Sequence, residues 1–211
     1  DGIRDIGVTG VQTCALPISP EKRRVQRTGP TRWSGDMSPA VAGLQEALQQ
    51  GVSQLGLPLG TGVQQQLLLH LDLMHKWNRV YNLTAVRDPQ TMLTQHLIDC
   101  LALLPPLLRH TRGRATALLD VGSGAGLPGV VLAICQPELQ VTCIDAVAKK
   151  TAFVQQVAAA LSLPNSSAHH GRVENLRGQW PLMTCRAFAS LADWVQGSQH
   201  LLSEQGRWLA M

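Results

Sequence analysis

The segment LLDVGSGAGLPG, residues 118–129, decides the fold that we expect for this chain. An apolar run ends in Asp120, and a tight turn follows with glycines at Gly122, Gly124, Gly126 and Gly129. A helical pattern comes next, and the following apolar run, VTCID at residues 141–145, ends in Asp145. This layout is typical of a nucleotide-cofactor site at the carboxyl edge of a parallel sheet.

Strand and helix patterns alternate from residue 115 onward. We expect strands at 117–121, 139–144, 167–170, 182–185 and 207–211, and helices at 129–135, 149–161 and 190–202. The alternation predicts an α/β fold with a doubly wound, mostly parallel, Rossmann-like sheet over residues 113–211. Because the fifth strand has only begun where the sequence stops, we expect this core to be truncated at its C-terminus.

Residues 37–112 predict an N-terminal helical extension with helices at 40–50, 63–78 and 91–104. Pro39 suits the first position of the first helix, and Pro105-Pro106 is expected to stop the last one. The middle helix is amphipathic, and an apolar face of this kind cannot be buried by the extension alone. We therefore expect the extension to pack on the core.

Residues 1–36 are rich in proline, glycine and basic residues and show no helical or strand period. Residues 2–18 also look like translated sequencing-adapter text. We expect a disordered or foreign N-terminal segment and leave it out of the fold.

The composition sets limits on the class of protein. Hydrophobic residues make up 45% of the 211 residues, which is enough to bury a core, and the net charge of +4 is compatible with a polyanionic partner. The five cysteines are scattered without a C-x-x-C pair, so we expect packing cysteines in a reducing, cytoplasmic compartment, and neither disulfides nor a metal site. No apolar run approaches the roughly 18 residues of a membrane span, so no membrane contact is expected.

Two cofactors compete for the glycine-rich turn. Gly124, Gly126 and Gly129 have the spacing of a dinucleotide fingerprint, and a dinucleotide would place its pyrophosphate at the helix N-terminus. S-adenosylmethionine carries no phosphate, and its ammonium and sulfonium groups favour a carboxylate such as Asp120 at the strand end. Asp145 suits both cofactors, because its carboxylate can accept the two ribose hydroxyls. The motif favours S-adenosylmethionine.

Several separate motifs resemble those of one family, the bacterial small-subunit rRNA (guanine-N7) methyltransferases known as RsmG or GidB. They are KWNRVYNLTA at 76–85, HLID at 96–99, the turn at 119–129, Lys149-Lys150, GRVE at 171–174 and CRAF at 185–188. The chain departs from the family pattern at Cys100, Pro181-Leu182 and Cys185. The resemblance implies a class I S-adenosylmethionine-dependent methyltransferase fold. It also implies methyl transfer to N7 of guanine 527 in 16S rRNA, as naked RNA or in the small ribosomal subunit.

The resemblance and the motifs together predict the cofactor site. It is expected to use Asp120, Gly122, Gly124, Gly126 and Leu127 on the methionine and ribose side, Asp145 at the ribose hydroxyls, Val173 and Glu174 at the adenine, and Arg186 beside the methyl group. N7 of guanine has a free lone pair and no proton to lose, so methyl transfer reduces to alignment and exclusion of water. We therefore assign no catalytic base or nucleophile and no metal.

Asn82, His96, Lys149 and Arg172 are candidates for binding RNA, and Lys76, Arg79 and Lys150 are further possible phosphate contacts. His96 and Asp99 lie three residues apart and share a helix face, which either covers the cofactor pocket or makes an ordinary helix–core contact. Arg186 pairs with the cofactor carboxylate, with an RNA phosphate or in a surface salt bridge.

Two other functions stay open from the sequence. An NAD-dependent oxidoreductase would explain the glycine spacing, although the only tyrosine, Tyr81, precedes the cofactor motif. An inactive RNA-binding fragment would explain an incomplete sheet. Binding of S-adenosylhomocysteine against NAD, followed by a methylation assay on ribosomal RNA, discriminates among the three.

Overall fold

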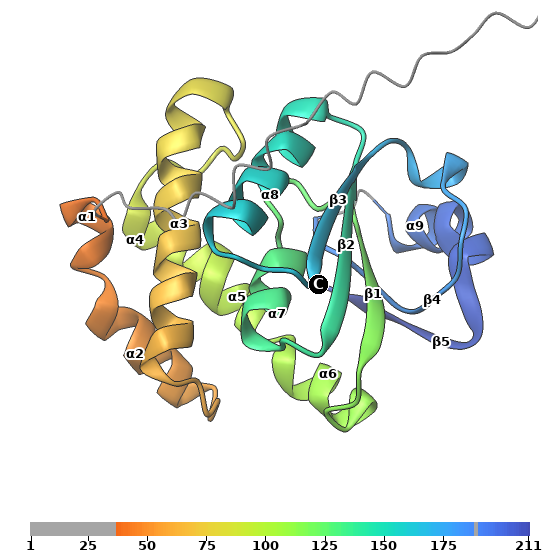
Figure 1. The fold of residues 1–211 in the computed structure, drawn as a ribbon, viewed down its shortest axis with the longest axis horizontal. Helices are drawn as coiled ribbons and strands as arrows, with labels where there is room; N and C mark the ends of the chain where they lie inside the picture. Colours follow the sequence, from red (N-terminus) through yellow and green to blue (C-terminus); the bar gives the residue numbers. More distant parts are fainter. Residues whose placement is uncertain (1–36, 188–189) are drawn as a thin grey trace, which may run out of the picture.

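The computed structural model describes residues 37–187 and 190–211, and its centre is a five-stranded sheet (Figure 1). The strands are β1 (Thr116–Val121), β2 (Leu139–Asp145), β3 (Ser166–His170), β4 (Trp180–Cys185) and β5 (Leu202–Ala210). All neighbours pair in parallel, in the order β3-β2-β1-β4-β5. This confirms the doubly wound α/β prediction, and it places the reversal of strand order between β1 and β4, where such folds bind ligands.

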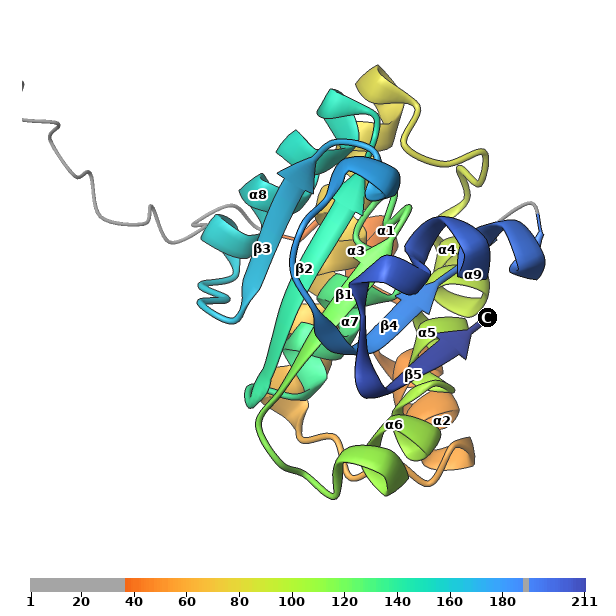
Figure 2. The same cartoon turned by 90° about the vertical axis from the view of Figure 1, so that its right-hand side faces the viewer.

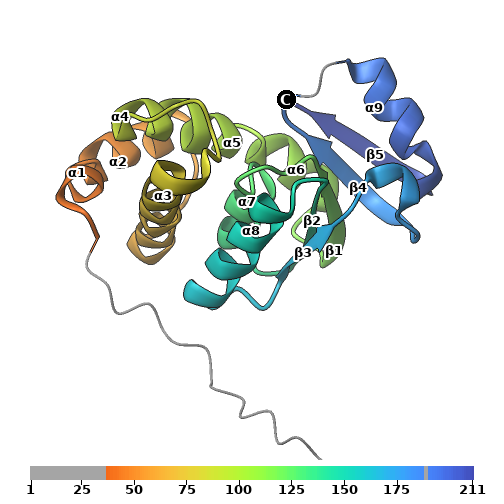
Figure 3. The same ribbon diagram turned by 90° about the horizontal axis from the view of Figure 1, so that it is seen from above.

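Helices cover both faces of the sheet (Figure 3). Helices α7 (Gly129–Cys135) and α8 (Ala148–Ala160) lie on one face, and α9 (Leu191–Ser198) with the short helix η3 (Gln199–Leu201) lies on the other. A short 3-10 helix, η2 (Val173–Asn175), follows β3. Figure 2 shows the sheet with one face toward the viewer, and α9 lies on that face near β4 and β5.

The helical extension packs outside α7 and α8 and shares their core, as expected. It comprises α1 (Pro39–Ala42), α2 (Gln45–Gln54), α3 (Thr61–Tyr81), α4 (Pro89–Met92), η1 (Leu93–Ile98), α5 (Asp99–Leu101) and α6 (Leu104–Thr111). The apolar side of α3, with Leu67, Leu71 and Met74, belongs to the same buried cluster as Val131 and Val154 of α7 and α8. Extension and sheet therefore have one hydrophobic core.

Three expected boundaries are wrong. The predicted helix at 40–50 is broken at Gly43 and Leu44, and its second part runs on to Gln54. Pro105-Pro106 does not end a helix but occupies the first turn of α6, where the missing N–H groups cost nothing. Strand β5 begins at Leu202 rather than at residue 207, because a register shift opposite Trp180 lets the polar segment 203–206 stay in the strand.

The helix expected at 91–104 contains a π-helical segment, η1, in place of regular α-helix. A π-turn holds more residues than an α-turn, and such segments often occur at functional sites. Leu93, His96 and Leu97 of η1 are buried. His96 of η1 and the following Asp99 lie beside Arg186 at the end of β4, as described below.

The membrane expectation needs a correction. The continuous helical stretch 89–111 has 23 residues and is apolar enough to cross a membrane by length and composition. Polar residues and two prolines interrupt it in the sequence, so no single apolar run marks it. Half of its most apolar window is buried inside the protein, as in a core helix. The four described cysteines are buried free thiols, which confirms their packing role.

Candidate active site

The glycine-rich turn is held against the end of β2. The backbone carbonyl of Ile144 accepts hydrogen bonds from the N–H of Gly122 at 2.8 Å and from the N–H of Ser123 at 3.1 Å. Asp145 Oδ2 accepts a third from the N–H of Gly124 at 3.0 Å. Gly122 and Gly124 have φ values of 68° and 55°, a left-handed conformation that glycine adopts without strain. The turn therefore depends on the strand end that carries Asp145.

Gly126 and Gly129 serve close packing and do not line the site. A Cβ at Gly126 would collide with the side chain of Val130, and a Cβ at Gly129 would lie 2.7 Å from Asp120 Oδ2. Gly129 lets α7 approach the sheet closely, and Gly126 leaves room for Val130 of α7 and Val154 of α8. Gly126 was expected to line the cofactor, and the structure places it beneath the turn instead.

Asp120 is completely buried under the same turn. Its Oδ2 accepts a hydrogen bond from the N–H of Gly129 at 2.8 Å, and its Oδ1 has no hydrogen-bond partner among the described residues. Burial, helped by the nearby Asp145 charge, raises the pKa of Asp120 to about 7, although the Gly129 N–H and Arg186 oppose the shift. Asp120 thus supports the turn from behind, with one acceptor oxygen unused.

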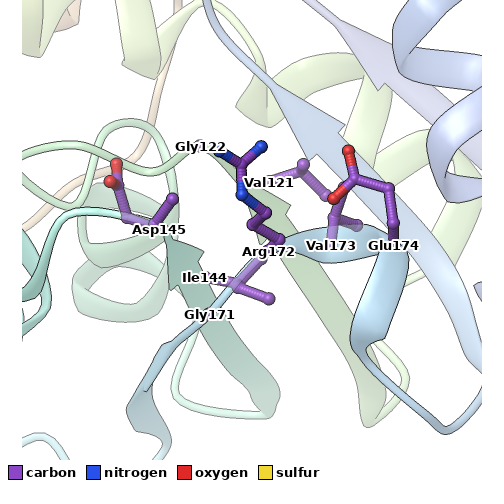
Figure 4. Close-up of a pocket in the computed structure, with 9 residues that line it drawn as sticks. Val121, Gly122, Ile144, Asp145, Gly171, Arg172, Val173 and Glu174 are labelled. Carbon is purple, nitrogen blue, oxygen red and sulfur yellow. The ribbon is translucent and has the colours of Figure 1, made fainter.

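A first hollow of about 220 Å³ lies at the ends of β1, β2 and β3 (Figure 4). We call it the β2-side hollow; its lining residues are Val121, Gly122, Ile144, Asp145, Ala146, Gly171, Arg172, Val173 and Glu174. Asp145 lies at one end and Glu174 at the other, with Arg172 between them. The structure therefore brings together the residues expected at the ribose and the adenine.

Asp145 has free acceptor capacity in this hollow. Its Oδ1 accepts a hydrogen bond from the N–H of Val147 at 2.8 Å, and Lys150 Nζ lies 3.7 Å from Oδ2. A carboxylate offers about four lone-pair sites, so positions remain beside those used by Val147 and Gly124. Two neighbouring hydroxyls of a ribose fit that capacity.

A second hollow of about 230 Å³ adjoins the first at Gly122, which lines both. We call it the β4-side hollow; its lining residues are Leu83, Thr84, His96, Gly122, Ser123, Gly124, Ala125, Leu127, Arg186 and Ala187. The predicted residues Gly124, Leu127, His96 and Arg186 meet here. Leu83, Thr84 and Ser123 were missed, although Leu83 and Thr84 belong to the 76–85 motif, of which Lys76, Arg79 and Asn82 were singled out.

Arg186 joins the end of β4 to the helical extension. Its Nη2 donates to the carbonyl of Gln95 at 2.5 Å and lies 3.5 Å from Asp99 Oδ2, and its Nη1 lies 3.2 Å from His96 Nδ1. His96 Nε2 in turn lies 2.9 Å from Thr84 Oγ1. Of the alternatives open from the sequence, the ion pair within the protein is therefore present, and Arg186 also lines the hollow.

A buried histidine links the extension directly to the glycine-rich turn. His70 of α3 is fully buried, and its Nε2 lies 3.0 Å from the carbonyl oxygen of Ala125. Burial lowers the pKa of His70 to about 4, so the ring is neutral at pH 7 and donates this hydrogen bond. The sequence offered no signal for it beyond a polar residue on the apolar face of a helix.

The remaining predicted residues lie outside the two hollows. Asn82 ends α3 with a φ of 49°, and its Oδ1 accepts a hydrogen bond from Arg87 Nη2 at 2.8 Å. Lys149 is exposed in the first turn of α8. Within residues 37–187 and 190–211 there is no cluster of three or more His, Cys, Asp or Glu side chains that could hold a metal ion.

A family model described as rRNA small subunit methyltransferase G matches residues 63–211, which is most of the chain. The chain belongs to this family. Curated relatives with the same name include proteins of Acidovorax ebreus, 55% identical over 176 residues (80% of this chain and 78% of the relative), and Paracidovorax citrulli, 53% identical over 186 residues (83% and 76%). The match covers the glycine-rich turn, Asp145 and both hollows.

Solved structures with a similar arrangement include two methyltransferases. One is an S-adenosylmethionine-dependent methyltransferase of Thiobacillus denitrificans in complex with S-adenosyl-L-homocysteine, 21% identical with a TM-score of 0.42 (51% of this chain and 46% of that one). The other is a ribosomal protein L11 methylase of Lactobacillus delbrueckii, 15% identical with a TM-score of 0.45 (54% and 59%).

The residues of the site fit S-adenosylmethionine. The spare capacity of Asp145 suits a ribose, the backbone at Gly124 has no side chain within 4 Å of where a Cβ would lie, and the unused Oδ1 of Asp120 is an acceptor suited to a cationic group. Asp120 itself does not line either hollow, so its contact with the cofactor stays a prediction.

Proposed function

We propose that this protein transfers the methyl group of S-adenosylmethionine to N7 of a guanine in 16S rRNA, at position 527 as the family resemblance implies. The observation that carries the proposal is the joining of the two hollows at Gly122 in a chain of this family. One hollow is suited to a nucleoside, and the other opens beside it, where an acceptor base can approach the methyl group.

The chain's residues have binding and orienting roles. Asp145 holds the ribose hydroxyls, Val173 and Glu174 flank the adenine, and Gly122 and Gly124 support the methionine side from the backbone. The cofactor supplies a methyl group already activated by its sulfonium. N7 has a lone pair and no proton to lose, so the protein needs to align the two groups and exclude water, which is worth several kcal/mol of the barrier.

We place the RNA contacts in and around the two hollows, on residues spread over the same edge. Arg172 is exposed and lines the β2-side hollow, while Asn82, His96 and Lys149 remain the other candidates. Near Asn82, the end of α3 exposes Val80 and Tyr81 next to Arg79. Basic and aromatic side chains together suit a single-stranded RNA segment. With 16S rRNA as partner, the protein works in the cytoplasm.

Calorimetry with S-adenosylhomocysteine and with NAD tests the cofactor half of the proposal. We expect binding of the first and none of the second, and the reverse result would restore the oxidoreductase interpretation. Methyl transfer to small-subunit RNA and to assembled small subunits tests the substrate half, with aniline cleavage locating N7-methylguanine. Binding of S-adenosylhomocysteine without methyl transfer to either substrate would contradict the proposed activity.

A further inference from the structure

We propose that the hydroxyl of Thr84 donates a hydrogen bond to O6 of the target guanine and thereby selects guanine over adenine. This inference rests on the proposed function and assigns a role to a residue of the β4-side hollow. Thr84 comes from the loop between α3 and α4, and it is half-buried at the wall of that hollow.

The position of Thr84 is fixed by a buried asparagine. Asn78 Oδ1 accepts a hydrogen bond from the backbone N–H of Thr84 at 2.9 Å, and Asn78 Nδ2 donates to the carbonyl of Val86 at 2.9 Å. Asn78 is 2% exposed, so water does not compete for these bonds. The loop is clamped on both sides of Thr84 before any ligand binds.

The hydrogen-bond directions around His96 follow from Arg186. A guanidinium can only donate, so His96 Nδ1 accepts from Arg186 Nη1 at 3.2 Å. Burial and the nearby guanidinium lower the pKa of His96, which keeps the ring neutral, so its single proton is on Nε2. His96 Nε2 therefore donates to Thr84 Oγ1 at 2.9 Å.

These directions leave the Thr84 hydroxyl as a donor. Its oxygen accepts from His96 Nε2 and also from the backbone N–H of Val86 at 3.2 Å, which uses both lone pairs. Its own proton has no acceptor among the residues that the structure describes. A hydroxyl in this state is free to donate to an acceptor atom of a ligand that enters the hollow.

Guanine offers that acceptor next to the atom that reacts. Its outer edge presents N7 and O6, both acceptors, whereas adenine presents N7 beside an N6 amino donor. A donor on N7 would occupy the lone pair that must take the methyl group, so recognition on this edge of the base has to use O6. The Thr84 hydroxyl would donate to O6 of guanine. With adenine it would face the N6 amino group, which is also a donor.

The placement of Thr84 favours the base over the cofactor as its partner. The sheet side of the β4-side hollow is the glycine-rich turn, which the proposed function assigns to the cofactor. Thr84 and His96 come from the helical extension instead. A carboxylate of the cofactor is the other oxygen acceptor that could reach Thr84, and the experiment separates the two.

The test combines two variants with a base analogue. Thr84→Val keeps the shape and removes the hydroxyl, and Thr84→Ser keeps the hydroxyl as the matched control. The substrates are small-subunit RNA with guanine at the target and the same RNA with 2-aminopurine, which keeps N7 and lacks O6. We expect kcat/KM to fall about tenfold for Thr84→Val on guanine, and about tenfold for the parent on 2-aminopurine.

The combination of both changes decides the assignment. If Thr84 contacts O6, Thr84→Val loses nothing further relative to the parent when the substrate carries 2-aminopurine, so the two changes together cost about tenfold, and Thr84→Ser behaves as the parent does. A purely structural effect of the valine would multiply with the analogue to about a hundredfold loss, which would overturn the proposal. Parental kcat/KM of Thr84→Val on guanine would overturn it as well.

Calorimetry with S-adenosylhomocysteine identifies the other source of an acceptor oxygen. We expect equal affinity in the parent and both variants. A tenfold weaker affinity in Thr84→Val alone would assign the hydroxyl to the cofactor carboxylate and overturn the contact with guanine. Failure of the proposed function is distinguishable, because it would be seen in the parent protein as absent methyl transfer to small-subunit RNA.

Discussion

The two hollows at the carboxyl edge of the sheet are built in different ways. The β2-side hollow is lined only by strand ends and the loops that follow them, within residues 121–174. The β4-side hollow needs three distant segments: residues 83–96 of the extension, the glycine-rich turn, and residues 186–187 after β4. A doubly wound sheet thus supplies a cofactor pocket by itself, whereas the pocket for an acceptor depends on what packs against the sheet.

Asp120 supports the turn that both hollows share, and changing it should have the largest effect. The pKa of this carboxyl is about 7 in the folded protein against an ordinary value of 3.8, so the folded state resists its ionisation. The corresponding stability is present below pH 4 and is lost as pH rises towards 7. At about 1.4 kcal/mol per pH unit, the loss reaches about 4 kcal/mol.

Asp120→Asn should remove this pH dependence. The free energy of unfolding, measured with urea at pH 4, 6 and 8, should fall less steeply with pH in the variant than in the parent. Glu138→Gln changes an exposed carboxyl before β2 and should keep the parental slope. Equal slopes in Asp120→Asn and the parent would show that Asp120 ionises normally.

Asp145→Ala should weaken cofactor binding in the β2-side hollow. Loss of two charge-assisted hydrogen bonds to the ribose should weaken S-adenosylhomocysteine binding by about 3 kcal/mol, roughly a hundredfold. Calorimetry measures the affinity, and thermal melting checks that the variant is folded. Glu138→Ala, at the other end of the same strand, should bind as the parent does. Parental affinity in a folded Asp145→Ala protein would exclude Asp145 from the site.

His70→Leu should remove the hydrogen bond that links the extension to the glycine-rich turn. The carbonyl of Ala125 would lose a buried donor, and an unsatisfied buried acceptor costs about 2 kcal/mol. We expect this loss in the free energy of unfolding, together with weaker S-adenosylhomocysteine binding. His70→Gln retains a donor and should lose less. If the leucine and glutamine variants match, the hydrogen bond does not position the turn.

Arg186→Ala should have the smallest effect on stability and affect the β4-side hollow alone. Its ion-pair partner Asp99 has a side chain 57% exposed, so solvent screens the pair and its loss should cost about 1 kcal/mol or less. Methyl transfer in single-turnover assays should fall more than S-adenosylhomocysteine affinity does. Arg207→Ala, an exposed arginine in β5, is the control. Parental transfer by Arg186→Ala would place the residue outside the reaction.

The sheet could be predicted because local sequence patterns mark its strands and turns. Strands β1, β2 and β4 are mainly apolar runs bounded by turn residues, and in a parallel sheet the strand ends meet at one edge. The residues at these ends, Asp145, Val173 and Glu174, follow from that rule without knowledge of any packing. Pro105-Pro106 misled the prediction because the same residues can follow one helix or begin the next, and only packing decides between them.

The β4-side hollow was only partly predictable because its contacts join distant residues. Arg186 contacts His96 and Gln95, about 90 positions away in the sequence. No local sequence pattern could therefore show that its guanidinium is already paired within the protein. Thr84 was missed because its donor role depends on hydrogen-bond directions that begin at Arg186. Gly126 was assigned to the cofactor because the sequence does not tell a glycine that faces a ligand from one that lets a helix approach.

Because the π-helical segment η1 carries His96, which lines the β4-side hollow, the number of residues in this helix affects the geometry of the candidate active site. His96 lies within η1, and its Nδ1 is 3.2 Å from Arg186 Nη1. Each residue of a regular α-helix turns the chain by about 100°. Deleting one residue between Leu93 and His96 would let the segment relax to α-helix and would rotate every later side chain against those before it. Insertions and deletions that a surface loop would tolerate are therefore excluded here, and alleles of this protein should vary in residue type along η1 long before they vary in its length.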